Sequence, residues 1–115
     1  MSEIKKFFIE FLKVLADQTR LDILDLLNRS EKTSAEIQEE INKSQSTISQ
    51  HLKLLINNNL IESESKKVGR KLIKYYRIKH PEIINLRSEI SSFVVKINKE
   101  KFVDMRDLDI IDTLF

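Results

Sequence analysis

The sequence contains no cysteine, and it has only one glycine and one proline in 115 residues. Without cysteine, the chain has no disulfides, no thiolate metal sites and no thiol redox switch. The single glycine, Gly69, is too little for a phosphate-binding glycine loop. Glycine and proline make most turns of β proteins, so their scarcity favours a mainly helical fold. We therefore expect helices, no metal site and no bound cofactor.

Long apolar runs and catalytic side-chain sets are also missing. The apolar runs span only a few residues, which is too short for a membrane-spanning helix. The N-terminal segment carries Glu3 and Glu10 and no cleavage signal, so we interpret it as folded structure and expect a cytoplasmic protein. Two histidines, His51 and His80, do not supply a nucleophile–base pair or a metal-ligand set. This argues against an enzyme.

Positive charge is concentrated in the middle third of the chain. The formal net charge is only +2, yet residues 41–80 contain nine basic and two acidic side chains. Residues 66–79 contain seven of these bases and no acid. A basic loop that is merely exposed is the simpler explanation. A run of this kind is, however, the footprint expected for contact with a polyanion.

Apolar periodicity predicts five helices. We expect them over residues 3–16, 19–29, 33–41, 45–58 and 81–102, with one more short helix over 103–115. Two of the starts carry capping signals. Thr33 and Glu36 have the spacing of a capping box, and Ser44 is a good N-cap for the fourth helix.

A period of two residues replaces the helical period after Leu60. It predicts strands over 61–65 and 72–78, joined by a loop around Gly69, where a positive φ is expected. The predicted fold class is therefore mainly α with a small β-hairpin, within the α+β class. At this length we expect one domain over residues 1–115.

The predicted helix over 45–58 has a polar face without acids. Its apolar stripe contains Ile48, Leu52 and Leu55, and the polar face contains Gln45, Ser46, Ser49, Gln50 and Lys53. Amides and hydroxyls can read base edges in the major groove of DNA. The alternative is a face that is simply solvated, and the face alone does not choose between the two interpretations.

Three segments resemble the ArsR family of winged-helix repressors. The opening of that family is similar to LADQTRLDILDLL at 15–27. Its recognition helix and first wing strand are similar to SQSTISQHLKLLINNNLIESES at 44–65, and its wing tip and second strand to VGRKLIKYYRI at 68–78. Two positions depart from the pattern, because Gln18 stands where many members have proline and Asn59 where many have glycine.

The resemblance implies a winged helix-turn-helix core over 17–80, flanked by dimerisation helices over 3–16 and 81–115. It also implies a homodimeric repressor that binds double-stranded DNA at a partly palindromic operator. Helix 44–58 would enter the major groove, and the wing over 61–78 would follow the backbone or minor groove. The expected DNA contacts are Gln45, Ser46, Thr47, Ser49, Gln50, Lys53, Lys66, Lys67, Arg70 and Lys71.

Two other binding functions remain open for such a domain. One is a winged-helix module that binds proteins, and the other is an architectural DNA-binding protein of low specificity. Many ArsR-family members release DNA when metals bind their cysteines or histidines, and this chain lacks those ligands. The sequence therefore predicts no metal site and leaves the effector open.

Phenylalanine is concentrated in the terminal helices, outside the expected three-helix core. An open apolar patch of this size is unusual for a monomer, which points to pairing with a second copy. The expected dimer interface contains Phe7, Phe8, Phe11, Phe93 and Ile97. In the alternative arrangement, the two terminal helices bury each other within one chain.

Overall fold

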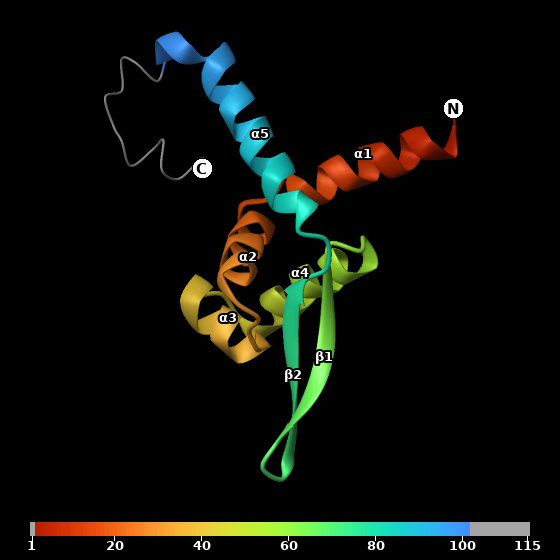
Figure 1. Ribbon diagram of the computed structural model, residues 1–115, viewed down its shortest axis with the longest axis vertical. Coiled ribbons are helices and arrows are strands. Elements are labelled where there is room, and N and C mark those ends of the chain that lie inside the picture. Colours follow the sequence, from red (N-terminus) through yellow and green to blue (C-terminus); the bar gives the residue numbers. More distant parts are fainter. Residues whose placement is uncertain (1, 102–115) are drawn as a thin grey trace. The chain divides into compact units, whose positions relative to one another are not determined.

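The computed structural model describes residues 2–101 and divides the chain into two compact units, Met1–His80 and Pro81–Phe115. The first unit contains α1 (Glu3–Leu15), α2 (Gln18–Arg29), α3 (Ser34–Ile41), α4 (Gln45–Asn57), β1 (Ile61–Val68) and β2 (Lys71–Ile78) (Figure 1). The second contains α5 (Glu82–Ile97). The predicted mainly helical fold with one antiparallel hairpin is confirmed. The short helix predicted over 103–115 lies outside the described residues.

The core of the first unit lies where α2, α3 and α4 meet the base of the hairpin. Ile23 of α2, Ile37 of α3, and Ile48 and Leu55 of α4 are almost completely buried. Ile61 joins them from the first position of β1 and is 1% exposed. Full burial of such a side chain stabilises the fold by roughly 1.5–3 kcal/mol. These residues therefore fix how each helix is rotated about its own axis.

Both predicted helix caps are confirmed. The Glu36 backbone N–H donates to Thr33 Oγ1 at 3.2 Å, and the Thr33 N–H donates to Glu36 Oε1 at 3.0 Å. At the start of α4, the Thr47 N–H donates to Ser44 Oγ at 3.2 Å. These bonds satisfy backbone donors that a helix start leaves without an intrahelical partner. The sequence therefore sets where α3 and α4 begin.

Two asparagines adopt the left-handed conformation at turns of the first unit. Asn42, after α3, has φ 58°, and Asn59, after α4, has φ 59°. Asparagine tolerates this region better than most residues. Asn42 turns the chain from α3 into α4, and its N–H donates to the Gln38 carbonyl at 2.9 Å. Asn59 thus adopts, at a position where the sequence pattern often has glycine, a backbone conformation that glycine adopts readily.

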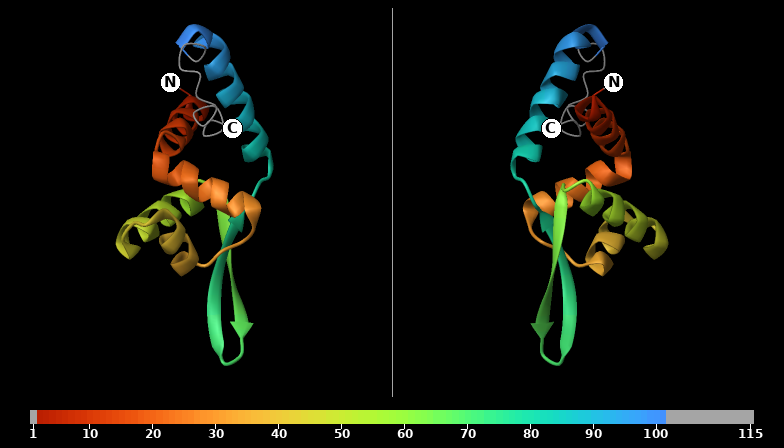
Figure 2. Two further views of the ribbon diagram at one scale, coloured as in Figure 1. Left: turned by 90° about the vertical axis from the view of Figure 1, so that its left-hand side faces the viewer. Right: turned by 90° about the vertical axis from the view of Figure 1, so that its right-hand side faces the viewer.

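The β-hairpin extends away from the three packed helices, and its strands coil around each other (Figures 1 and 2). Eight residue pairs connect β1 and β2, from Ile61 opposite Ile78 to Val68 opposite Lys71. Gly69 lies at the tip with φ 64°, as predicted. The base of the hairpin is anchored by Lys32, whose N–H and carbonyl pair with those of Tyr76 at 3.0 and 2.8 Å.

Both strands extend beyond their predicted ends. The predicted loop over 66–71 shrinks to Gly69 and Arg70, because Lys66 and Lys67 pair with Ile73 and Leu72. Lysine has a low intrinsic strand preference, and here the cross-strand partners outweigh it.

The second unit contains α5, which is interrupted at Asn98, and residues 99–101 are helical again, so the helix predicted over 81–102 is broken at this position. The Asn98 side chain donates to the Val94 carbonyl at 2.9 Å, and its N–H bonds to the Val94 and Val95 carbonyls at 3.2 Å. These bonds occupy the last carbonyls of α5 where the helix is interrupted. Among the described helices, none has both the length and the apolar character needed to cross a membrane.

Candidate nucleic-acid interface

The polar face of α4 is presented to solvent as the sequence predicts. Ile48, Leu52 and Leu55 point into the core with exposures of 0–2%. Their burial leaves the opposite side of the helix open, and that side carries Gln45, Ser46, Ser49, Gln50 and Lys53, all of them exposed. The face offers amide and hydroxyl groups and one cation, and no carboxylate. Such groups both donate and accept hydrogen bonds, as base edges require.

Thr47 differs from the other predicted DNA contacts on α4. It is half-buried, and its hydroxyl accepts a hydrogen bond from Ser44 Oγ at 2.8 Å. Its backbone N–H is also bound to Ser44. Thr47 therefore takes part in closing the first turn of the helix, and its contact with DNA stays a prediction.

Arg20 forms hydrogen bonds that link α4 to the end of α1. Its guanidinium donates from Nε to the Val14 carbonyl at 2.6 Å and from Nη2 to the Lys13 carbonyl at 3.3 Å. Its Nη1 lies 3.1 Å from His51 Nδ1 in the middle of α4. Because a guanidinium only donates, His51 Nδ1 must be the acceptor in this contact. Arg20 thus connects the end of α1 with α4, a connection that the sequence reasoning missed.

Asp17 completes this cluster as the N-cap of α2. Its Oδ1 accepts from the Arg20 backbone N–H at 3.0 Å. This bond, assisted by the charge of the Arg20 guanidinium, holds the pKa of Asp17 below its ordinary value against the opposing effect of desolvation. The carboxylate is therefore charged in the folded protein at neutral pH and stabilises the helix N-terminus.

The tip of the hairpin carries an exposed group of cations. Lys67, Arg70 and Lys71 are exposed, and Gly69 supplies the positive φ that places Arg70 at the turn. Lys74, which was not among the predicted contacts, is exposed on β2. Within residues 2–101, these four cations have no carboxylate partner. Backbone phosphates of nucleic acids are the usual partners of such wing cations.

Lys66 has a different environment from its neighbour Lys67. Its Nζ binds the Glu31 carboxylate, and it lies 5.3 Å from the centre of the Tyr75 ring. The hydrogen bond to Glu31 raises the pKa of Lys66 above its ordinary value. Lys66 thereby ties the wing to the loop between α2 and α3. Its predicted DNA contact stays a prediction.

Arg77 is likewise occupied by acids at the base of the hairpin. Its Nε donates to Glu62 Oε1 at 2.9 Å and its Nη1 to Glu64 Oε2 at 2.5 Å. The hydrogen bond from Arg77 also lowers the pKa of Glu64. Of the seven bases in residues 66–79, at least two are therefore already neutralised within the hairpin and its adjoining loop.

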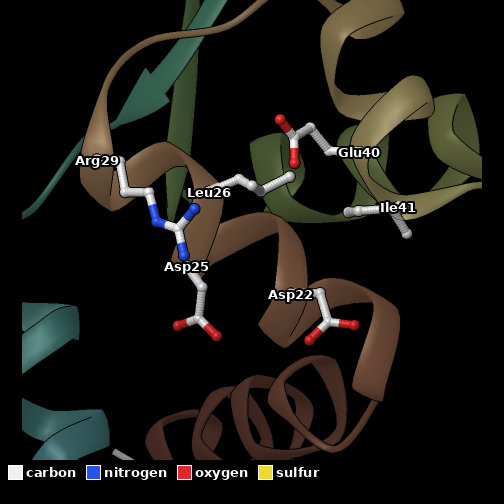
Figure 3. Close-up of a pocket in the computed structure, with 6 residues that line it drawn as sticks. All are labelled: Asp22, Asp25, Leu26, Arg29, Glu40 and Ile41. Carbon is white, nitrogen blue, oxygen red and sulfur yellow. The ribbon is translucent and has the colours of Figure 1, made fainter. Parts of the chain in front are cut away.

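An open hollow of about 330 Å³ lies beside α2 and α3 (Figure 3). Its lining consists of Asp22, Asp25, Leu26, Arg29, Glu40 and Ile41. Asp22 and Asp25 point in the same direction from neighbouring turns of α2 (Figure 3). Three carboxylates against one guanidinium make this surface unfavourable for a phosphate. In the described part of the chain, no group of three or more histidine or acidic side chains is placed to hold a metal ion.

The predicted dimer residues lie on helices with open apolar faces. On α1, Phe7 is 72% and Phe8 59% exposed, while Phe11 is half-buried. On α5, Phe93 is 59% and Ile97 62% exposed. Each of the two helices thus carries an apolar stripe that is open to solvent.

Comparison with known proteins connects this geometry to a family. The model of "Bacterial regulatory protein, arsR family" matches residues 17–63. The chain is 39% identical over 69 residues to an arsenical resistance operon repressor of Staphylococcus aureus, covering 60% of this chain and 62% of that one. It is 35% identical over 89 residues to the Bacillus subtilis repressor of the same name, covering 76% of this chain and 81% of that one. The match thus spans less than two thirds of the staphylococcal protein.

A solved structure from Mycobacterium bovis has the same fold. It is described as the homodimeric winged helix-turn-helix DNA-binding domain of a possible ArsR-family regulator. The TM-score is 0.68 at 24% identity, and the match covers 82% of this chain and 87% of the other. At this identity the likeness concerns the fold, which is a winged helix-turn-helix.

Proposed function

The chain belongs to the arsR family of bacterial regulatory proteins, and from this premise we propose that it is a homodimeric transcriptional repressor that binds double-stranded DNA. The observation that carries the proposal is the exposed, acid-free face of α4, formed by Gln45, Ser46, Ser49, Gln50 and Lys53. An ordinary solvated face mixes acids and bases. This one presents the groups that recognise base edges.

The buried stripe of α4 supports this function from the opposite side. Ile48, Leu52 and Leu55 hold the helix against the core, so its polar face has a fixed orientation. In helix-turn-helix proteins, the second helix of the motif enters the major groove and the first crosses the backbone. We assign these positions to α4 and α3.

The exposed apolar stripes on α1 and α5 support the homodimer. Phe7, Phe8 and Phe93 are each more than half exposed. Aromatic side chains contribute much of the binding energy when an interface buries them. Pairing with a second copy would also give two α4 helices, which suits an inverted repeat with half-sites about 34 Å apart. The M. bovis relative, described as homodimeric and DNA-binding, supports this assembly.

The signal to which such a repressor responds does not pass through a cysteine thiolate of this chain. The sequence has no cysteine, so it offers no thiolate to a soft metal or metalloid. The repressors to which it is similar are named for arsenical resistance, and that part of their description is not transferred here.

Selection from a random duplex library tests the proposal. The purified protein is incubated with the library at near-physiological salt, and bound duplexes are amplified and sequenced. We expect enrichment of an inverted repeat with half-sites one helical turn or slightly more apart. Binding at low salt without enrichment would favour an architectural DNA-binding protein. No binding even at low salt would favour a protein-interaction module.

A further inference from the structure

The hairpin has two chemically different faces. In an antiparallel pair, opposite residues point to the same side and successive residues alternate. The observed register therefore divides the side chains into two sets. The acid-bearing face contains Glu62, Glu64, Lys66, Val68, Lys71, Ile73, Tyr75 and Arg77. The acid-free face begins at the base with Ile61, Tyr76 and Ile78, and its outer part contains Ser63, Ser65, Lys67, Leu72 and Lys74.

The acid-bearing face is neutralised by its own ion pairs. Arg77 is shared by Glu62 and Glu64, and Lys66 is held by Glu31 of the preceding loop. Lys71 lies on this face next to the tip, so three carboxylates are matched by three cations. A phosphate approaching Lys66 or Arg77 would have to displace a carboxylate from the cation.

The acid-free face has the opposite character. All five residues of its outer part are exposed. Lys67 is opposite Leu72 and Lys74 is opposite Ser65, so the two lysines are diagonal neighbours with backbones roughly 7–8 Å apart. Like charges at this separation repel each other when no acid lies between them. An anion bound between them relieves that repulsion.

The remaining side chains of this face also suit a nucleic-acid backbone. Ser63 and Ser65 present hydroxyl donors at alternate positions of β1, and hydroxyls commonly bind phosphate oxygens. Leu72 is 73% exposed, and an apolar side chain in this place can pack on a sugar or a thymine methyl group. The same side of the ribbon begins at Ile61, which is buried in the helical core. Ser63, two residues further along β1, therefore lies on the face of the hairpin that packs on the helices at its base.

We propose that the wing contacts DNA through its acid-free face, with Lys67 and Lys74 binding phosphates, and that the other face points away from DNA along its acid-bearing part, from Glu62 to Lys66. This rests on the proposed DNA-binding function and makes it more specific. It adds Ser63, Ser65, Leu72 and Lys74 to the interface. It gives Lys66 a structural task, which is to hold the loop at Glu31 against the wing.

Two adjacent lysines of β1 provide a matched test. Lys66→Ala and Lys67→Ala each remove one positive charge, from opposite faces of the same strand. Affinity for the selected operator is measured by fluorescence anisotropy between about 50 and 200 mM salt, because counterion release makes the affinity for DNA fall steeply over this range. Thermal melting of each variant checks that it is folded, and Lys74→Ala is measured alongside.

The expected result is a difference between the two faces. Because the dimer carries each lysine twice, Lys67→Ala and Lys74→Ala should each reduce the slope of log affinity against log salt by about 1.8 and weaken binding by about 25- to 100-fold at 0.1 M salt. Lys66→Ala should leave the slope unchanged. Equal slopes for Lys66→Ala and Lys67→Ala would overturn the assignment of the faces while leaving DNA binding intact. A wild-type protein that binds no DNA would overturn the proposed function and this inference with it.

Discussion

Replacing Arg20 by methionine should destabilise the first unit strongly. The substitution keeps most of the aliphatic length of the side chain and removes its five N–H donors. Three acceptors then lose their partner: the Val14 carbonyl at 2.6 Å, the Lys13 carbonyl at 3.3 Å and His51 Nδ1 at 3.1 Å. Both carbonyls belong to the last turn of α1, where no intrahelical donor replaces the guanidinium. The arginine side chain is only 13% exposed, so water replaces it poorly.

The size of the effect follows from these contacts. A hydrogen bond from a charged donor contributes about 1.5–3 kcal/mol, and the long bond to Lys13 counts for less. We expect the free energy of unfolding to fall by about 2–4 kcal/mol, which is a large part of the roughly 5–15 kcal/mol of a typical domain. At about 4 °C per kcal/mol, the melting temperature should fall by roughly 8–16 °C.

Urea and thermal unfolding followed by circular dichroism measure this loss. Protein concentration is held constant, because dimer formation makes the apparent stability depend on it. Arg70→Met is the matched control, since Arg70 is exposed at the wing tip and its loss should change stability by less than about 0.5 kcal/mol. If Arg20→Met lost no more stability than Arg70→Met, the three contacts would not contribute to the fold.

Three further predictions concern the DNA contacts, the dimer and the response to acid. Gln50→Ala should change which operator sequences are preferred, whereas Arg70→Ala should weaken binding to all sequences and flatten the slope of log affinity against log salt. Uniform losses of affinity in both variants would contradict the division between base contacts by α4 and phosphate contacts by the wing. Phe93→Glu should give monomers in sedimentation velocity, and a variant that still sediments as a dimer would refute the role of this residue. The lowered pKa of Asp17 contributes stability at neutral pH that is lost as the pH falls below its ordinary value of 3.8 and through its lower folded value. Urea midpoints should therefore fall less between pH 5 and about pH 3 in Asp17→Asn than in the wild type, and parallel curves would argue against this contribution.

The helical part of the fold was predictable because its signals are local. The hydrogen bonds of the two caps join residues only three positions apart, Thr33 with Glu36 and Ser44 with Thr47. The apolar spacing of Ile48, Leu52 and Leu55 identified the buried side of α4, and the exposure of its opposite side confirmed the rotation of the helix. Local chemistry of this kind needs no knowledge of the tertiary structure.

The contacts that were missed join residues far apart in the sequence. Lys66 meets Glu31 across 35 residues, and Arg20 meets His51 across 31. No periodicity in the sequence records such pairs. A stricter use of strand alternation could have separated Lys66 from Lys67, because Glu62 and Glu64 mark one face of β1. The adjacent Lys66 and Lys67 suggested a loop instead, so the alternation of side chains along β1 was not applied to them.

The distinction between cations that are bound to carboxylates and cations that are not also sets the salt dependence of DNA binding by the whole dimer. The cations without a carboxylate partner in the described hairpin and on the polar face of α4 are Lys53, Lys67, Arg70, Lys71 and Lys74. Two copies present ten of them, which limits the slope of log affinity against log salt to about −9. Counting Lys66, Arg77 and Lys79 as well would give sixteen and a slope of about −14. Because two of these three are held by carboxylates and the third binds Asn59 Oδ1 at 3.3 Å, we expect a slope no steeper than the first value. A slope near the second would mean that the paired cations leave their partners when DNA binds, and the two faces of the wing would then not differ in function.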